Sequence, residues 1–373
     1  MEIGLFMVPF RDPSTGMKEG FEWDMQVIRW AEEFGLSEVW IAEHSTMRWE
    51  PVASPELYIA AALNQTKNIK FGTGANIPGN HNPMALAYRL MQLDHMSGGR
   101  LMIGLGNGAY ASDHKVFGND DPVGKGREAI QIMRKIWEEK GPYKFEGKYW
   151  SFEMPDYDEI QMGPFWEPYQ KPHPPLLMAG LSPASNTLRA AGKLGYLPMS
   201  FNVSREYLEG HWYRYMQGAT ESGFVADRND WRVATNIFVA DTDEEAMDAV
   251  VNGAMGKCYR EWMLPGYARG NMLPVMAPEL GTNDPDKIPI EFLAEEKWLV
   301  GSPDTIMKKL DKDLKASGGF GKIISFTFDY LDQPDVYRRH FELLGTEIIP
   351  RLAEITHQTE SLADLKRPEG ITD

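Results

Sequence analysis

The sequence lacks the residues from which disulfide frameworks and metal clusters are built. Its 373 residues include a single cysteine, Cys258, which excludes an intramolecular disulfide and a cysteine-based metal cluster. One cysteine fits a reducing compartment, so we expect a cytoplasmic protein. The eight histidines show neither HxH nor HExxH spacing, and the sequence therefore predicts no metal site.

Positive charge is also scarce. Lys and Arg number 38 against 54 Asp and Glu, a formal net charge of −16, which argues against nucleic acid or an anionic membrane as a partner. No apolar run is long enough to cross a bilayer. The first ten residues, MEIGLFMVPF, have no basic n-region and are predicted to form a core strand, not a signal peptide. GxSxG and GxxxxGKS motifs are absent as well, so the sequence has neither the α/β-hydrolase nucleophile motif nor the P-loop of nucleotide-binding proteins.

What is present is a repeated alternation of a short apolar run and a helical pattern. Such alternation predicts parallel strands joined by helices. The predicted strands are residues 3–8, 38–42, 69–75, 101–105, 176–179, 196–201, 231–240 and 322–328. Eight such units without a break in composition predict an α/β fold, a single closed TIM (β/α)8 barrel.

Several segments depart from that repeat. Residues 143–152 alternate aromatic and polar side chains around a glycine, which predicts a small hairpin. Residues 263–297 are rich in Pro, Gly and Met and show no periodicity, so we expect an irregular insertion that could cover the site. A mobile surface insertion without a role is an equal alternative. We expect one domain over residues 1–356 and a polar tail over residues 357–373.

Helix starts are marked by capping residues. Thr242-x-x-Glu245 forms a capping box. Ser-Pro pairs at 54–55, 182–183 and 302–303 each place a capping Ser before a Pro at the first helical position.

Candidate chemistry lies just past the predicted strands, because the carboxyl ends of barrel strands carry the active site. Glu43 and His44 follow the second strand and are suited to polar contact or proton transfer. Their plainer alternative is a histidine bonded to a neighbouring backbone. The other candidates are Asn76 and His81 after the third strand, and Asn107, Tyr110, Asp113 and His114 after the fourth.

The segment after the fifth strand, Gly180-Leu181-Ser182-Pro183-Ala184-Ser185, offers backbone N–H groups at a helix start and two hydroxyls. This combination suits an anion such as a phosphate. Simple helix capping by Ser182 remains the alternative.

Three long stretches resemble one family. They are EVWIAEHSTMRWEPVASPELYIAAALNQTKNIKFGTG, LDHMSGGRLMIGLGNGAYASDHKVFG and LLMAGLSPASNTLRAAGKLGYLPMS. Together with MEIGLFMVP and VGSPDTIMKKLDKDLKASG, they resemble the luciferase-like flavin-dependent oxidoreductases, which are TIM barrels. The segment AEHSTMRWE looks most like the diketocamphane monooxygenases and is similar to limonene-type hydroxylases.

The resemblance implies a two-component monooxygenase. A separate flavin reductase would supply reduced FMN, which reacts with O2 to give a flavin C4a-peroxide. One oxygen atom would then go to a small apolar ketone or terpenoid, by Baeyer–Villiger insertion or hydroxylation. The resemblance also implies a homodimer.

The resemblance assigns roles by position. His44 matches the family's active-site histidine, with Glu43 as its neighbour. Thr73-Gly74-Ala75 match the segment that contacts the isoalloxazine, where the family often has a non-proline cis peptide. Gly180 to Ser185 match the phosphate-binding turn. The full set of expected FMN-binding residues is Thr73, Gly74, Ala75, Asn107, Tyr110, Ala179, Gly180, Leu181, Ser182 and Ser185.

Three positions depart from bacterial luciferase. Its two adjacent histidines are His44-Ser45 here, its phosphate-binding basic residue is Asn107, and its reactive cysteine is Gly106. Light emission and long-chain aldehydes are therefore not expected. Two alternatives stay open, a deazaflavin-dependent dehydrogenase on the same barrel and a non-catalytic flavin-binding protein.

Overall fold

The computed structural model describes residues 1–156, 158, 160, 166–358, 360–368 and 371. The chain divides into two compact units. The first unit comprises residues 1–39, 48–50 and 178–373, and the second comprises residues 40–47 and 51–177.

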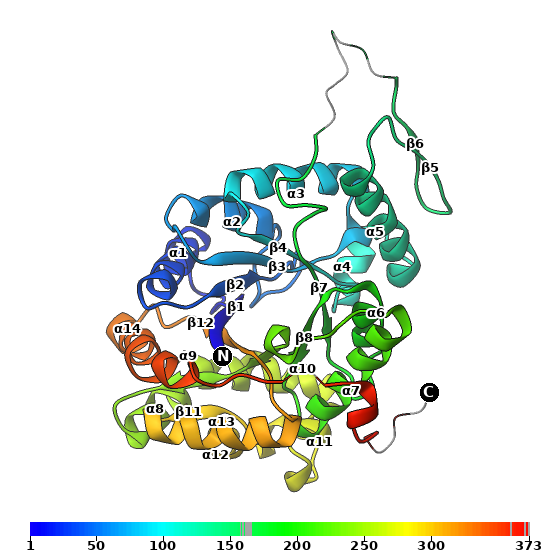
Figure 1. The fold of residues 1–373 in the computed structure, drawn as a ribbon. Coiled ribbons are helices and arrows are strands. Elements are labelled where there is room, and N and C mark those ends of the chain that lie inside the picture. Colours follow the sequence, from blue (N-terminus) through cyan, green and yellow to red (C-terminus); the bar gives the residue numbers. More distant parts are fainter. Residues whose placement is uncertain (157, 159, 161–165, 359, 369–370, 372–373) are drawn as a thin grey trace. The chain divides into compact units, whose positions relative to one another are not determined.

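Eight strands form a closed barrel in the order β1-β12-β9-β8-β7-β4-β3-β2 (Figure 1). Registered pairs such as β1 with β12 and β3 with β4 are parallel. The barrel strands are β1 (Glu2–Phe10), β2 (Glu38–Ile41), β3 (Lys70–Asn76), β4 (Leu101–Leu105), β7 (Leu176–Gly180), β8 (Leu197–Phe201), β9 (Arg232–Thr235) and β12 (Lys322–Phe328). All eight overlap the predicted strands, so the predicted barrel is confirmed.

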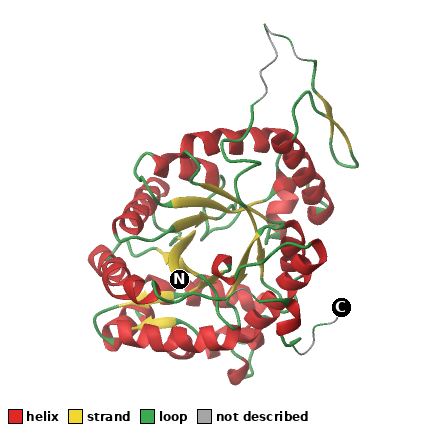
Figure 2. Ribbon diagram, viewed as in Figure 1, coloured by secondary structure: helices red, strands yellow, loops and turns green. Residues whose placement is uncertain are grey.

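The strands form where apolar residues run without interruption. In β1 every residue from Ile3 to Phe10 is buried, and in β4 all five residues are buried. Continuous apolar runs of this kind are typical of parallel strands covered on both faces. In each unit, helices flank the strands (Figure 2).

The helices of the second unit are α2 (Pro55–Leu63), α3 (Pro83–Ser97), α4 (Ala111–Val116) and α5 (Pro122–Glu138). Those of the first unit are α1 (Met17–Glu33), α6 (Asn186–Leu194), α7 (Arg205–Ser222), α8 (Asp243–Val251), α9 (Ala254–Cys258), α10 (Leu264–Arg269), α11 (Leu273–Met276), α12 (Ile290–Glu296), α13 (Pro303–Ser317), α14 (Pro334–Leu343) and α15 (Ile349–Leu352). The predicted capping box at Thr242 and Glu245 is confirmed at the start of α8.

The predicted strand over residues 231–240 is wrong in its extent. It is split into β9 and β10 (Ile237–Val239), and β10 pairs with β11 (Leu299–Gly301) outside the barrel. The break falls at Asn236, whose side chain donates to the Tyr259 hydroxyl at 2.7 Å. The three residues of β11 are too short a run to stand out in the sequence.

The loop after β4 leads into a helix, α4, which begins directly after Tyr110. One further expectation needs correction. Residues 263–297 contain α10, α11 and α12, although the sequence shows no periodicity there. α11 and α12 are four and seven residues long, which is too short for a periodic pattern. α10 continues the helix that starts with α9, through a π-helical turn over Tyr259–Met263.

The predicted hairpin over residues 143–152 is confirmed as β5 (Lys144–Glu146) paired antiparallel with β6 (Ser151–Glu153). It projects beyond α5 in Figure 1. Its turn is attached to α5 by Glu128, which accepts from the backbone N–H groups of Lys148, Tyr149 and Trp150. No helix in the described part of the chain is long and apolar enough to span a bilayer.

Candidate active site

The extension of β2 carries the first group of candidate residues, all in the second unit. We call Glu43, His44, Asn76, Tyr110, His81 and Asp113 the His44 cluster. Glu43 is 3% exposed, and its carboxylate accepts three hydrogen bonds. The donors are Asn76 Nδ2 at 3.0 Å, the Ile77 N–H at 3.4 Å and His81 Nε2 at 2.8 Å. Glu43 therefore holds the end of β3 and the segment after it in place.

His44 is the next residue along the chain. Its ring packs edge-on against Tyr110 at 5.0 Å between centroids, and its Nδ1 lies 4.0 Å from Asp113 Oδ2. Burial lowers the pKa of His44 to about 4, although the Asp113 charge acts in the opposite direction. The imidazole is therefore neutral near pH 7 and can accept a proton.

Asp113 is itself held from the same segment as His44. It is 2% exposed, and its Oδ1 accepts from the Thr46 hydroxyl at 2.7 Å. Asp113 was among the candidates past the fourth strand, but its partnership with Thr46 has no signal in the sequence. The link joins the loop after β2 to α4.

The end of β3 contains the non-proline cis peptide expected from the resemblance, between Gly74 and Ala75. Both residues are half-buried. Thr73 is fully buried, and its hydroxyl bonds with both the N–H and the C=O of Gly104 in β4, each at 3.1 Å. The Thr73 side chain thus serves the β3–β4 contact, whereas Gly74 and Ala75 are partly exposed.

The loop after β4 is open. Asn107 is exposed, while Tyr110 is half-buried against His44. A Cβ at Gly106 would lie 3.4 Å from the Ala75 Cβ, so this glycine keeps the loop close to the cis peptide.

The second group of candidates lies in the first unit, where β7 leads into α6. We call Gly180 to Ser185 the Ser182 turn. The predicted cap by Ser182 is wrong, because α6 begins at Asn186 and its N-cap is Ser185, whose hydroxyl accepts from the Leu188 N–H. Pro183 and Ala184 form a turn instead, and the Ser182 carbonyl accepts from His211 Nε2 at 2.8 Å.

The geometry of the Ser182 turn suits an anion. Ser182 and Leu181 are exposed, and Ala179 in β7 is half-buried. A Cβ at Gly180 would lie 2.5 Å from Leu188 Cδ1, so the chain approaches α6 as closely as a glycine allows. The first N–H groups of a helix have no intrahelical acceptor, and they are donors for a negatively charged group.

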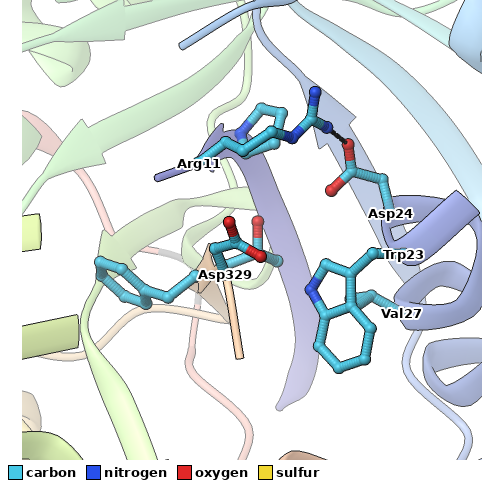
Figure 3. Close-up of a pocket in the computed structure, with 8 residues that line it drawn as sticks. Arg11, Trp23, Asp24, Val27 and Asp329 are labelled. Carbon is cyan, nitrogen blue, oxygen red and sulfur yellow. Dashed lines mark hydrogen bonds and ion pairs between the residues drawn. The ribbon is translucent and has the colours of Figure 1, made fainter. Parts of the chain in front are cut away.

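A buried ionic cluster lies at the carboxyl ends of β1 and β12, also in the first unit (Figure 3). Arg11 pairs with Asp24 of α1, and both are buried. Asp329 accepts from the Asp12 N–H at 3.1 Å and from the Thr15 hydroxyl at 2.7 Å. The residues around this cluster leave no room for a water molecule between them, and Asp329 connects the loop after β1 to the end of β12.

No group of three or more His, Cys, Asp or Glu side chains within the described ranges could hold a metal ion. Of the candidates past the strands, Glu43, His44, Asn76, His81, Tyr110 and Asp113 come together in the His44 cluster. His211, which holds the Ser182 turn, was missed because it lies in the middle of α7 with no motif around it.

Comparison with known proteins shows to which family this barrel is similar. A family model described as luciferase-like monooxygenase matches residues 1–320. The chain is 31% identical to 2,5-diketocamphane 1,2-monooxygenase 1 of Pseudomonas putida, over 94% of this chain and 99% of that protein. It is 29% identical to limonene 1,2-monooxygenase of Rhodococcus erythropolis, over 94% of this chain and 86% of that protein.

A solved structure agrees with these matches. The oxygenating constituent of 3,6-diketocamphane monooxygenase from the CAM plasmid of Pseudomonas putida, a type II Baeyer–Villiger monooxygenase in complex with FMN, superposes with a TM-score of 0.90. The two chains are 32% identical, and the match covers 96% of this chain and 100% of that one. The chain therefore belongs to the luciferase-like monooxygenase family.

Proposed function

We propose that this protein is the oxygenase component of a two-component, FMN-dependent monooxygenase that acts on a small apolar ketone or terpenoid. Its reaction is Baeyer–Villiger insertion or hydroxylation. One atom of O2 enters the substrate and the other leaves as water, and reduced FMN from a separate flavin reductase supplies the two electrons. The observation that carries this proposal is the 0.90 TM-score, at 32% identity, with an FMN-bound diketocamphane monooxygenase.

The residues present fit FMN. The Ser182 turn supplies backbone donors and two hydroxyls to a phosphate, and Gly180 permits the close approach that the turn needs. In the second unit, the half-buried backbone of Gly74 and Ala75 suits a flat ring system. We assign FMN binding to Thr73, Gly74, Ala75, Asn107, Tyr110, Ala179, Gly180, Leu181, Ser182 and Ser185. When bound, reduced FMN supplies the activation of O2.

We assign the proton-handling role to His44. It is neutral near pH 7 because burial lowers its pKa to about 4, and a neutral imidazole can accept a proton and return it within one turnover. Glu43 has an orienting role, since its carboxylate already accepts from Asn76, Ile77 and His81.

The proposed oxygenation is tested with isotopically labelled oxygen. Chemically reduced FMN, the protein and a bicyclic ketone such as a camphor diketone are mixed with oxygen-18 gas, and the products are analysed by mass spectrometry. We expect a lactone carrying one labelled atom. A panel of cyclic ketones and monoterpenes then ranks substrates and separates insertion from hydroxylation.

The alternatives give different results in the same assay. A deazaflavin-dependent dehydrogenase would give no labelled product with FMN. It would oxidise or reduce the substrate only when the oxidised or reduced deazaflavin replaces FMN, and would bind the deazaflavin more tightly than FMN. A non-catalytic flavin-binding protein would bind FMN and give no product with any member of the panel.

Three further expectations belong to this proposal. We propose a homodimer, testable by sedimentation equilibrium, and a cytoplasmic location, which fits the single buried cysteine and is testable by fractionation of the native host. We also propose that residues 263–297 cover the substrate in a single domain over residues 1–356. Slower proteolysis of that segment with FMN and ketone present would support the cover.

A further inference from the structure

Helix α7 touches the Ser182 turn through two consecutive residues, Gly210 and His211. His211 is fully buried, and its Nε2 lies 2.8 Å from the Ser182 carbonyl oxygen. A carbonyl oxygen only accepts hydrogen bonds, so Nε2 carries the proton. The bond fixes the peptide between Ser182 and Pro183, inside the turn.

Gly210 brings the backbone of α7 against the next peptide of the same turn. A Cβ at this position would lie 2.8 Å from the Pro183 carbonyl oxygen, closer than real Cβ contacts. Any larger residue would displace the turn or the helix. Two independent contacts from α7 therefore determine where the Ser182 and Pro183 carbonyls lie.

The helix that follows the turn is also locked to α7. A Cβ at Gly192 of α6 would lie 2.0 Å from the Tyr215 carbonyl oxygen, and one at Gly218 of α7 would lie 1.8 Å from the Arg189 carbonyl oxygen. The two helices lie side by side in Figure 1, with their backbones in contact at these glycines. The start of α6, with its N–H donors, therefore cannot shift without α7.

His211 is held as a neutral donor. Its Nδ1 is buried without a hydrogen-bond partner in the described part of the chain, and burial lowers the pKa of the ring to about 4. A neutral ring with the proton on Nε2 offers one donor in one direction. It acts on the turn and is not a charged ligand of an anion.

We propose that His211 is a positioning residue for the phosphate of FMN, which it serves by holding the Ser182 carbonyl so that the N–H groups of the turn and of α6 converge on the phosphate. Gly210 acts with it by permitting the close approach of α7. The inference rests on the proposed function, in which the Ser182 turn binds that phosphate.

The test compares FMN with riboflavin, which has the same ring system and no phosphate. Dissociation constants of the reduced forms are measured under anaerobic conditions for the full-length protein and its variants. In His211→Leu, which removes the donor, we expect FMN binding to weaken about tenfold and riboflavin binding to change by less than about twofold, since one lost hydrogen bond to a binding loop corresponds to about one decade. His211→Gln retains an N–H donor and should recover most of the FMN affinity.

A second variant and a matched control distinguish a loss of phosphate positioning from a general loss of protein stability. Gly210→Ala should reduce FMN affinity selectively, because its methyl group displaces the Pro183 carbonyl. His340→Leu alters another buried histidine of the first unit, which accepts from the Val239 N–H and packs on Phe238. It should lower thermal stability and leave the ratio of FMN to riboflavin affinity unchanged.

The outcomes separate this inference from the proposed function. If the wild type prefers FMN to riboflavin and His211→Leu weakens both flavins equally, the positioning role is overturned and the phosphate assignment stands. If the wild type binds both flavins equally, the assignment of the phosphate to the Ser182 turn is overturned, and the role of His211 with it.

Discussion

The His44 cluster and the Ser182 turn are built in opposite ways. In the His44 cluster the proposed functional groups are side chains, namely an imidazole beside a carboxylate and a second carboxylate that accepts three hydrogen bonds. In the Ser182 turn they lie in the backbone, and a side chain from α7 holds that backbone. Each region contains a histidine whose pKa burial lowers to about 4.

The difference in construction predicts a difference in function. His44 is half-buried beside exposed loop residues, so its proton can be exchanged with a bound ligand. His211 is fully buried and already donates to Ser182, so it exchanges no proton in the reaction. We therefore expect the two regions to fail separately when they are altered, one in turnover and the other in cofactor affinity.

The largest expected effect is on turnover. His44→Ala should lower kcat for oxygenation by about 100-fold or more, the usual contribution of a general acid–base group, with little change in the dissociation constant for reduced FMN. Steady-state product formation and anaerobic titration measure the two quantities. Turnover close to that of the wild type would remove His44 from the mechanism.

A structural effect should come from its neighbour. Glu43→Ala removes the acceptor for Asn76, the Ile77 N–H and His81, so we expect the free energy of unfolding to fall by about 3 kcal/mol. Glu43→Gln keeps an acceptor oxygen and should lose about 1 kcal/mol. Urea denaturation measures both. A loss of turnover in Glu43→Ala without a loss of stability would favour a direct catalytic role over an orienting one.

Acid should destabilise the protein through His211. The folded-state pKa of His211, about 4, lies below the ordinary value of 6.5, so the unfolded chain binds the proton first as the pH falls. Stability is therefore complete above about pH 6.5 and is lost between that value and pH 4, by roughly 3 kcal/mol for this residue.

The matched variant is His211→Gln, which has no titrating group. Its free energy of unfolding, measured by urea denaturation from pH 7 to pH 4.5, should fall less steeply than that of the wild type. Identical slopes would contradict the buried neutral state of His211.

The smallest expected effect is on the environment of His44. Asp113 raises the pKa of His44 against the larger effect of burial, so Asp113→Asn should lower that pKa further. We expect the acidic limb of the pH–rate profile to move to lower pH and kcat at neutral pH to fall by less than about tenfold, that is by less than about 1.4 kcal/mol. An unchanged profile would show that the Asp113 charge does not act on His44, and a shift to higher pH would show that it acts in the opposite direction.

Much of the fold could be predicted because its signals are local. The eight barrel strands are continuous apolar runs, and the capping box at Thr242 and Glu245 is readable from two residues. The missed elements β11, α11 and α12 are too short for a periodic pattern. The break between β9 and β10 falls at Asn236, whose hydrogen bond with Tyr259 is a tertiary contact that the sequence does not show.

The candidate site shows the same division. The positions of Glu43, His44 and Asp113 past the strands marked them as candidates, because strand ends meet at one edge of a barrel. The Ser182 turn was also identified, but the capping residue was wrong, since a Ser-Pro pair cannot show whether the helix begins at once or after a further turn. His211 and Gly210 could not be identified, because their role follows from the packing of α7 against α6.

If the His44 cluster serves turnover and the Ser182 turn serves cofactor affinity, one set of assays on wild type, His44→Ala and His211→Leu will separate the two properties. The assays measure kcat for oxygenation at saturating reduced FMN, together with the dissociation constants for reduced FMN and reduced riboflavin. We predict that His44→Ala loses kcat and keeps both affinities, whereas His211→Leu keeps kcat and loses affinity for FMN alone. Loss of both properties in both variants would contradict the account, because it would show that the His44 cluster and the Ser182 turn act as one unit.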